Sequence, residues 1–191
     1  MKVLAINGSP RKDGNTAILI KAVLDELKKE GIETELIQFS GKTIQGCKAC
    51  LKCFENKDKK CVFDNDDFNE CLEKIIEADG IILGSPTYFT DVTSEMKGLI
   101  DRTGFVSFAN GRFLSRKTGA AVVAVRRAGS IHVFDTLNHF FFINEMMVPG
   151  SCYWNMGFGR EKGEVEKDEE GLKTMRVLGQ NMAWMMKRLY E

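Results

Sequence analysis

The sequence predicts an α/β fold: a doubly wound, five-stranded parallel sheet with helices on both faces. Continuous apolar runs at residues 80–84 (Gly-Ile-Ile-Leu-Gly) and 119–125 (Gly-Ala-Ala-Val-Val-Ala-Val) are typical of strands that are covered on both faces. Segments with apolar residues at helical spacing alternate with the expected strands. Because parallel strands need crossover connections, this alternation favours a single doubly wound domain over residues 1–191.

The elements can be placed in order along the chain. A strand at residues 3–6 leads through a loop into a helix around 20–27, where apolar residues recur at i, i+3, i+4 and i+7. Residues 40–65 have no periodicity and are expected to form a cysteine-rich loop within the domain. The other expected elements are strands at 33–39, 80–84, 119–125 and near 146–148, the last with a possible extension at 153–155, and helices at 68–76, 94–102, 134–141 and 175–189.

The charge balance excludes some classes of partner. The chain has 27 basic and 27 acidic residues, so its formal net charge is zero. Nucleic acids and anionic membranes usually bind strongly basic surfaces, and neither is expected here. No apolar run approaches the length of about 18 residues that suggests a membrane span, and no signal-peptide pattern is visible. We therefore expect a cytoplasmic protein, in which six cysteines favour metal binding or catalysis over disulfides.

The loop at residues 7–16 is the first candidate binding site. It leads into a helix, whose unpaired N–H groups and positive dipole end suit a phosphate. The spacing of Gly8 and Gly14 fits neither a P-loop nor a dinucleotide fingerprint, which favours a phosphomonoester over a pyrophosphate. An ordinary βα turn is the alternative. The candidate residues are Ser9, Arg11, Lys12, Asn15 and Thr16.

Two later loops follow strands in the same way, so all three should meet at one edge of the sheet. The second presents aromatic side chains beside backbone amides, which suits a flat ring. Its candidate residues are Pro86, Thr87, Tyr88 and Phe89. The third could place Arg127 or backbone amides, including that of Gly129, near the electron-rich end of the ring. Together the loops predict a flavin mononucleotide (FMN) site; core aromatics and surface arginines are the alternatives.

These stretches resemble the NADPH-dependent FMN reductase and iron-sulfur flavoprotein family over nearly the entire chain. The resemblance is carried by residues 8–16, 84–89, 96–102 and 126–129. It implies a flavodoxin-like fold, tightly bound FMN, and homodimers or homotetramers whose flavins lie near subunit interfaces. Carried over by position, it implies that Ser9, Arg11, Asn15 and Thr16 hold the phosphate and that residues 86–89 hold the ring.

Four cysteines form a second candidate site. Cys47, Cys50, Cys53 and Cys61 are spaced C-x2-C-x2-C-x7-C. Three closely spaced thiolates can bind three corners of a [4Fe–4S] cube, and a fourth can reach it on a flexible loop. Zinc binding and metal-free thiols are the alternatives. The seven residues between Cys53 and Cys61 make a longer gap than is typical of the family pattern. Of the four expected ligands, Cys61 is therefore the one that the pattern indicates least strongly.

The two sites together favour an enzyme that transfers electrons through FMN and a [4Fe–4S] cluster, with NAD(P)H or ferredoxin as donor. The protein would position the cofactors and tune them, so no side chain is assigned as a catalytic group. One alternative is a non-catalytic, flavodoxin-like electron carrier. Another is a thiol or metal redox sensor with structural FMN.

Overall fold

The computed structural model describes residues 1–190, which form one parallel sheet of five strands in the order β2-β1-β3-β4-β5. The strands are β1 (Lys2–Asn7), β2 (Glu33–Gln38), β3 (Gly80–Pro86), β4 (Thr118–Val125) and β5 (Met156–Phe158). The helices are α1 (Asn15–Lys29), α2 (Lys52–Asn56), α3 (Phe68–Glu77), α4 (Ser94–Ala109), α5 (Ser130–Ile143) and α6 (Glu169–Tyr190), with a short 3-10 helix, η1 (Glu164–Lys167). The predicted fold class is confirmed.

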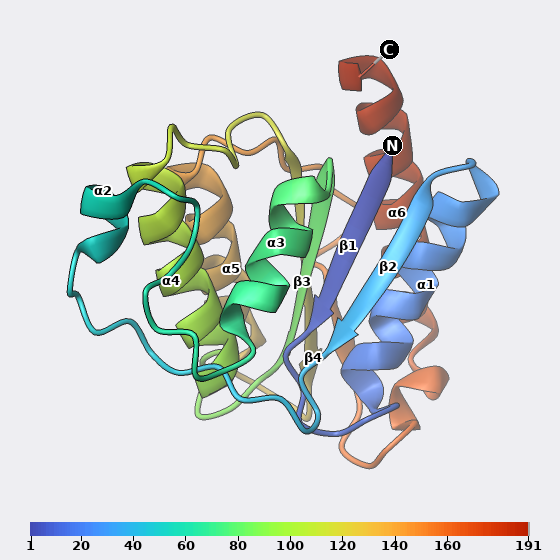
Figure 1. The fold of residues 1–191 in the computed structure, drawn as a ribbon. Helices are drawn as coiled ribbons and strands as arrows, with labels where there is room; N and C mark the ends of the chain where they lie inside the picture. The colour runs from blue at the N-terminus through green and yellow to red at the C-terminus, as the bar shows by residue number, and fades with distance from the viewer. Residues whose placement is uncertain (191) are drawn as a thin grey trace.

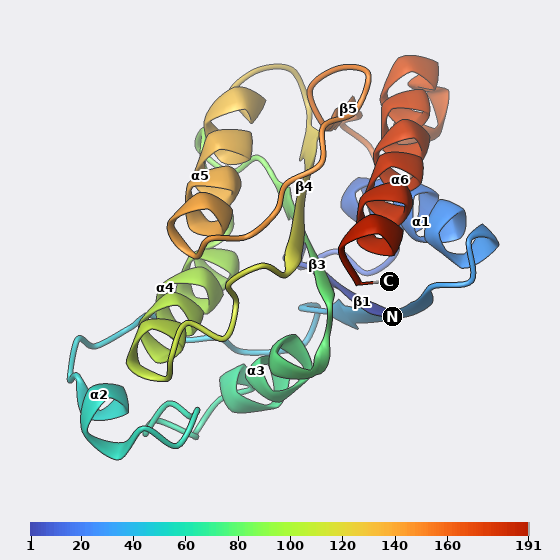
Figure 2. The same cartoon turned by 90° about the horizontal axis from the view of Figure 1, so that it is seen from above.

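The helices form a layer on each face of the sheet. Figure 2 shows α1 and α6 on one side and α3, α4 and α5 on the other. The alternating side chains of β1 supply both cores: Val3 and Ala5 pack with α1 and α6, whereas Leu4 and Ile6 pack on the opposite face. Because β4 is buried along its whole length, its sequence is a continuous apolar run rather than an alternating one.

Two of the sequence predictions about elements need correction. The strand expected near residues 146–148 is wrong, because only Met147 makes a bridge there, to Thr118 of β4. Pro149 lacks an N–H donor and Gly150 follows it, so the chain leaves the sheet and pairs again only at β5. Within the cysteine-rich segment, α2 forms a short helix that the missing periodicity did not predict.

Two further observations complete the fold. The helix α4 extends to Ala109, beyond the predicted end at residue 102. Within residues 1–190, no helix combines the length and the hydropathy needed to cross a membrane.

The contact between α1 and α6 depends on a glycine. A Cβ atom built on Gly179 would lie 2.7 Å from the carbonyl oxygen of Val23 and 2.8 Å from Cβ of Glu26. A side chain at this position would therefore push the two helices apart, since a backbone oxygen cannot move alone.

We predict that Gly179→Ala destabilises the protein by about 1–3 kcal/mol, because the added methyl group overpacks the contact between the helices. Gly104→Ala is the matched control in another helix, since its Cβ would come no closer than 3.9 Å to a neighbouring atom. Alanine should there stabilise α4 by about 0.5–1 kcal/mol. Urea unfolding measures both, and equal midpoints for the two variants would contradict the packing argument.

Candidate functional site

The loops after β1, β3 and β4 line one pocket at the carboxyl edge of the sheet, the lower edge in Figure 1. The space between these loops, counted together with its opening to solvent, is about 570 Å³. Its lining consists of Ser9, Arg11, Asn15, Thr16, Pro86, Thr87, Tyr88, Ala124, Arg126, Gly159 and Arg160. Seven of the eleven residues predicted to bind the cofactor are therefore in its wall.

The first loop is fixed by hydrogen bonds to its neighbours. The N–H of Gly8 donates to the carbonyl of Gly84 on β3 over 2.8 Å, and the hydroxyl of Thr93 donates to the carbonyl of Gly8 over 2.9 Å. Ser9 accepts a bond from the N–H of Arg11 over 3.1 Å. The loop is thus held between β3 and the start of α4 before any ligand binds.

The start of α1 suits an anion. Its N-cap is Gly14, which offers no side-chain acceptor, and the first turn, Asn15-Thr16-Ala17, is uncharged. The first N–H groups of the helix are therefore available to a negatively charged ligand beside the pocket. Thr16 is buried, and its methyl group lies toward Gly84.

The side chain of Asn15, which was predicted to bind phosphate, instead makes hydrogen bonds to the chain after β5. Its Nδ2 donates to the carbonyls of Gly159 and Glu161 over 2.9 and 3.0 Å, and its Oδ1 accepts from the N–H of Gly163 over 2.9 Å. The side chain therefore holds the segment after β5 against α1 and brings Arg160 into the wall of the pocket. Lys12 is exposed and lies outside that wall.

The second loop contains a tight turn with unusual backbone angles. Tyr88 and Asp91 exchange two backbone hydrogen bonds of 2.9 and 3.0 Å, and between them Phe89 and Thr90 have φ values of 47° and 71°. Residues with side chains rarely adopt this left-handed conformation, and such strain is typical of ligand-binding loops. Phe89 is fully exposed and lies outside the lining of the pocket, although its neighbour Tyr88 is part of it.

The third loop lies against the second. Gly129 has a φ of 87°, and a Cβ built on it would lie 3.2 Å from Cα of Thr90. Gly129 and the exposed Arg127 are both outside the lining of the pocket, whereas Arg126 is part of it.

Sequence reasoning missed four lining residues: Ala124, Arg126, Gly159 and Arg160. For Arg126, a usable signal was its place directly after the buried run of β4, because residues that follow a parallel strand lie at the carboxyl edge of the sheet. For Gly159 and Arg160 no local signal exists, since contacts from Asn15 to a distant segment place them.

The four predicted cysteines all line a second pocket. Cys47 and Cys50 are exposed, while Cys53 and Cys61 are partly buried. Burial raises the pKa of the Cys53 thiol, and the nearby Cys50 and Cys61 add to this effect. Within residues 1–190, no three Cys, His, Asp or Glu side chains are gathered in a metal-binding group. The four thiols therefore share one pocket but are spread along its wall.

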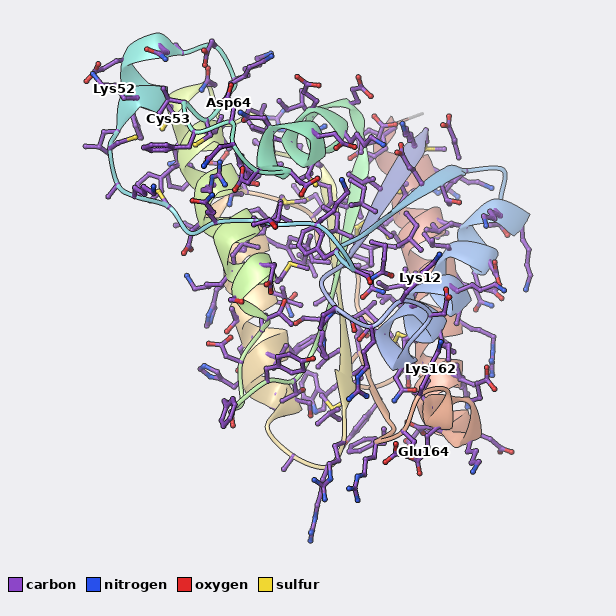
Figure 3. The ribbon with its side chains drawn as sticks, turned by 60° about the horizontal axis from the view of Figure 1, so that its bottom comes forward. Lys12, Lys52, Cys53, Asp64, Lys162 and Glu164 are labelled. Atoms are coloured by element: carbon purple, nitrogen blue, oxygen red, sulfur yellow. The ribbon has the colours of Figure 1, made fainter. Side chains whose placement is uncertain are left out.

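The backbone of this segment turns sharply. Ala49, Leu51, Lys57 and Lys59 all have positive φ values, between 50° and 60°. These turns bend the chain around the pocket, next to Val106 on α4. Figure 3 shows Cys53 at the upper left of the molecule and Lys12 on the right, in the loop that precedes α1.

Comparisons with known proteins show which family the sequence belongs to. The model of the family described as NADPH-dependent FMN reductase matches residues 1–161. An iron-sulfur flavoprotein of Methanocaldococcus jannaschii is 40% identical over 194 residues, which cover 98% of each chain. An iron-sulfur flavoprotein of Archaeoglobus fulgidus is 33% identical and covers 95% of this chain and 94% of its own.

Solved structures share the fold at low sequence identity. An NAD(P)H:quinone oxidoreductase from Methanothermobacter marburgensis superposes with a TM-score of 0.69 at 14% identity, covering 95% of this chain and 96% of its own. An archaeal flavodoxin superposes with a TM-score of 0.63 at 17% identity, covering 98% and 99%. The fold and the sequence family agree, and the chain belongs to the NADPH-dependent FMN reductase family of flavin-dependent oxidoreductases.

Proposed function

We propose that this oxidoreductase transfers electrons between NAD(P)H or ferredoxin and an acceptor through FMN and a [4Fe–4S] cluster. The observation that carries the proposal is the pairing of an anion-binding helix end with an aromatic loop in one pocket and four thiols in another. When bound, FMN supplies two-electron uptake with one-electron release, and the cluster supplies single-electron transfer. The names of the relatives in two archaea support both cofactors.

In this proposal the first pocket binds FMN. The hydroxyls of Ser9 and Thr16 and the first N–H groups of α1 bind the phosphate, and Arg11 and Arg160 balance its charge. Asn15 positions Arg160 rather than binding phosphate itself. Lys12 contributes charge at longer range.

The ring of FMN would lie against the second and third loops. Pro86, Thr87 and Tyr88 line the pocket beside it, and Phe89 is exposed where it can cover an open face of the ring. Arg126 takes the role first given to Arg127, facing the electron-rich end of the flavin. Gly129 lets the third loop approach the turn at Thr90.

The cysteine pocket would bind the cluster through Cys47, Cys50, Cys53 and Cys61. Thiolate donors of this number suit a cubane, and cluster formation would bring the four sulfurs close to one another. Exposed thiols persist in a reduced form in the cytoplasm, which is the location that we propose.

The two pockets are far apart within one chain. Thr93, which caps α4, contacts the first loop, whereas Val106 of the same helix lines the cysteine pocket. At about 1.5 Å per residue, this separation along the helix is about 20 Å. We therefore propose a homodimer or homotetramer, in which the cysteine pocket of one copy can lie near the FMN pocket of another.

The donor can be tested directly. We expect NADPH, NADH or both to bleach the flavin absorbance of the FMN-loaded protein in anaerobic stopped-flow mixing, because the family is named for a nicotinamide donor. Reduced ferredoxin serves as the parallel donor. If ferredoxin reduces the flavin and neither nicotinamide does, the nicotinamide part of the proposal fails.

The phosphate site can be tested with Thr16→Val, which keeps the buried shape and removes the hydroxyl. We expect FMN to bind roughly tenfold more weakly in a fluorescence titration of the apoprotein, since one hydrogen bond to a charged group contributes about 1.5 kcal/mol or more. Thr34→Val on β2, away from the pocket, is the matched control. Unchanged affinity in Thr16→Val would remove this residue from the phosphate site.

Cluster content is a separate measurement. Anaerobic reconstitution should give about four iron and four sulfide per chain, the composition of one [4Fe–4S] cluster. Cys47→Ser should lower both and leave FMN binding unchanged, because the two pockets share no residue. Absence of iron in the reconstituted wild type would contradict the cluster.

A further inference from the structure

A buried arginine forms part of the wall of the cysteine pocket. Arg102 on α4 has a side chain that is only 3% exposed, and its ion-pair partner Asp66 is 1% exposed. The Arg102 guanidinium also donates to the carbonyl of Phe63 over 2.8 Å and to that of Gln45 over 3.3 Å, and it lies over the ring of Phe68. These partners come from both ends of the cysteine-bearing segment.

Asp66 links the two ends of the cysteine-bearing segment by hydrogen bonds. Its carboxylate accepts from the N–H of Gln45 over 2.8 Å and from that of Phe68 over 3.3 Å, in addition to Arg102. The backbone of Gln45 is therefore bonded at two atoms: its N–H donates to Asp66, and its carbonyl accepts from Arg102. Burial acts to raise the pKa of Asp66, but the bonds from Arg102 and Gln45 hold it below its ordinary value.

The cysteine after the long gap is fixed in place by a separate contact. The N–H of Cys61 donates to Oδ1 of Asn69 over 2.9 Å, and Nδ2 of Asn69 donates back to the carbonyl of Cys61 over 2.9 Å. Asn69 lies in the first turn of α3, so this reciprocal pair fixes the backbone of Cys61 to a helix.

Cys61 lies two residues before Phe63, whose carbonyl accepts from Arg102. Cys61 and Arg102 line the same pocket. Burial acts to lower the pKa of Arg102, but its bond to Asp66 helps to hold it above its ordinary value. A guanidinium has five N–H donors, and the carboxylate and two carbonyls leave donors for a sulfur.

A buried ion pair is not explained by stability alone. Removing two charges from water is costly, and a well-packed apolar pair often stabilises a fold equally well. A positive charge beside a metal centre has a further effect, because it stabilises the more negative, reduced form. Hydrogen bonds to cluster sulfurs act in the same direction.

We propose that Arg102 is a positioning residue for the metal centre: it orients Cys61 as the fourth thiolate ligand and raises the reduction potential of the centre. Asn69 fixes the backbone of the same ligand. The inference rests on the proposed cluster. Arg102 is not a ligand of the cluster in this inference; it is a buried side chain that acts on a ligand.

The test compares Arg102→Lys, the double variant Arg102→Met/Asp66→Leu, and Arg112→Met. The double variant removes both buried charges together, so that no unpaired carboxylate prevents folding. Arg112 is an exposed arginine just beyond α4 and serves as the matched control. Each protein is reconstituted anaerobically, and circular dichroism and FMN binding report its fold.

We expect the double variant to fold and bind FMN like the wild type, to release iron to a chelator roughly 10- to 100-fold faster, and to have a lower cluster reduction potential. Arg102→Lys keeps the charge but loses the planar fork, so its potential should lie between those of the wild type and the double variant. Arg112→Met should behave like the wild type.

A double variant with wild-type iron release and reduction potential would overturn the inference and leave the cluster intact. If the double variant does not fold, the potential of Arg102→Lys decides: a wild-type value overturns the inference, and a lower value supports it. If the wild type itself takes up no iron, the proposed cluster fails and the role of Arg102 fails with it.

Discussion

The close approach of α1 to β3 is the constraint on which the first pocket depends. A Cβ atom on Gly84 would lie 2.5 Å from Cδ1 of Ile20 and 3.2 Å from Cγ2 of Thr16, so only glycine allows the helix to lie this near the sheet. The same residue accepts the hydrogen bond of Gly8. One position thus fixes both the start of α1 and the loop before it, and the first N–H groups of α1 come to the carboxyl edge as a result.

The two sites are built from different kinds of contact. At the first, loops from neighbouring parallel strands meet because the topology brings them to one edge, and Asn15 adds a segment from the far end of the chain. At the second, a segment outside the sheet is held by a buried ion pair between Arg102 and Asp66. The first site follows from the fold class. The second lies in a segment outside the sheet, and buried polar contacts such as the ion pair of Arg102 and Asp66 hold that segment in place.

Local patterns therefore predicted some parts of this protein better than others. The buried runs of β3 and β4 and the cysteine spacing are local signals, and they led to the sheet and to the set of thiols that line one pocket. Met146 to Val148 is also apolar, but Pro149 prevents a continuous strand, so the position of β5 was missed. Arg160 and Arg102 were missed because contacts distant in sequence place them.

The helix α4 touches both sites. Its N-cap, Thr93, accepts from the N–H of Met96 and donates to the loop at Gly8, while Arg102, more than two turns further on, anchors the cysteine segment. The two sites therefore share one structural element, and a single helix determines how far the first loop lies from the cysteine segment.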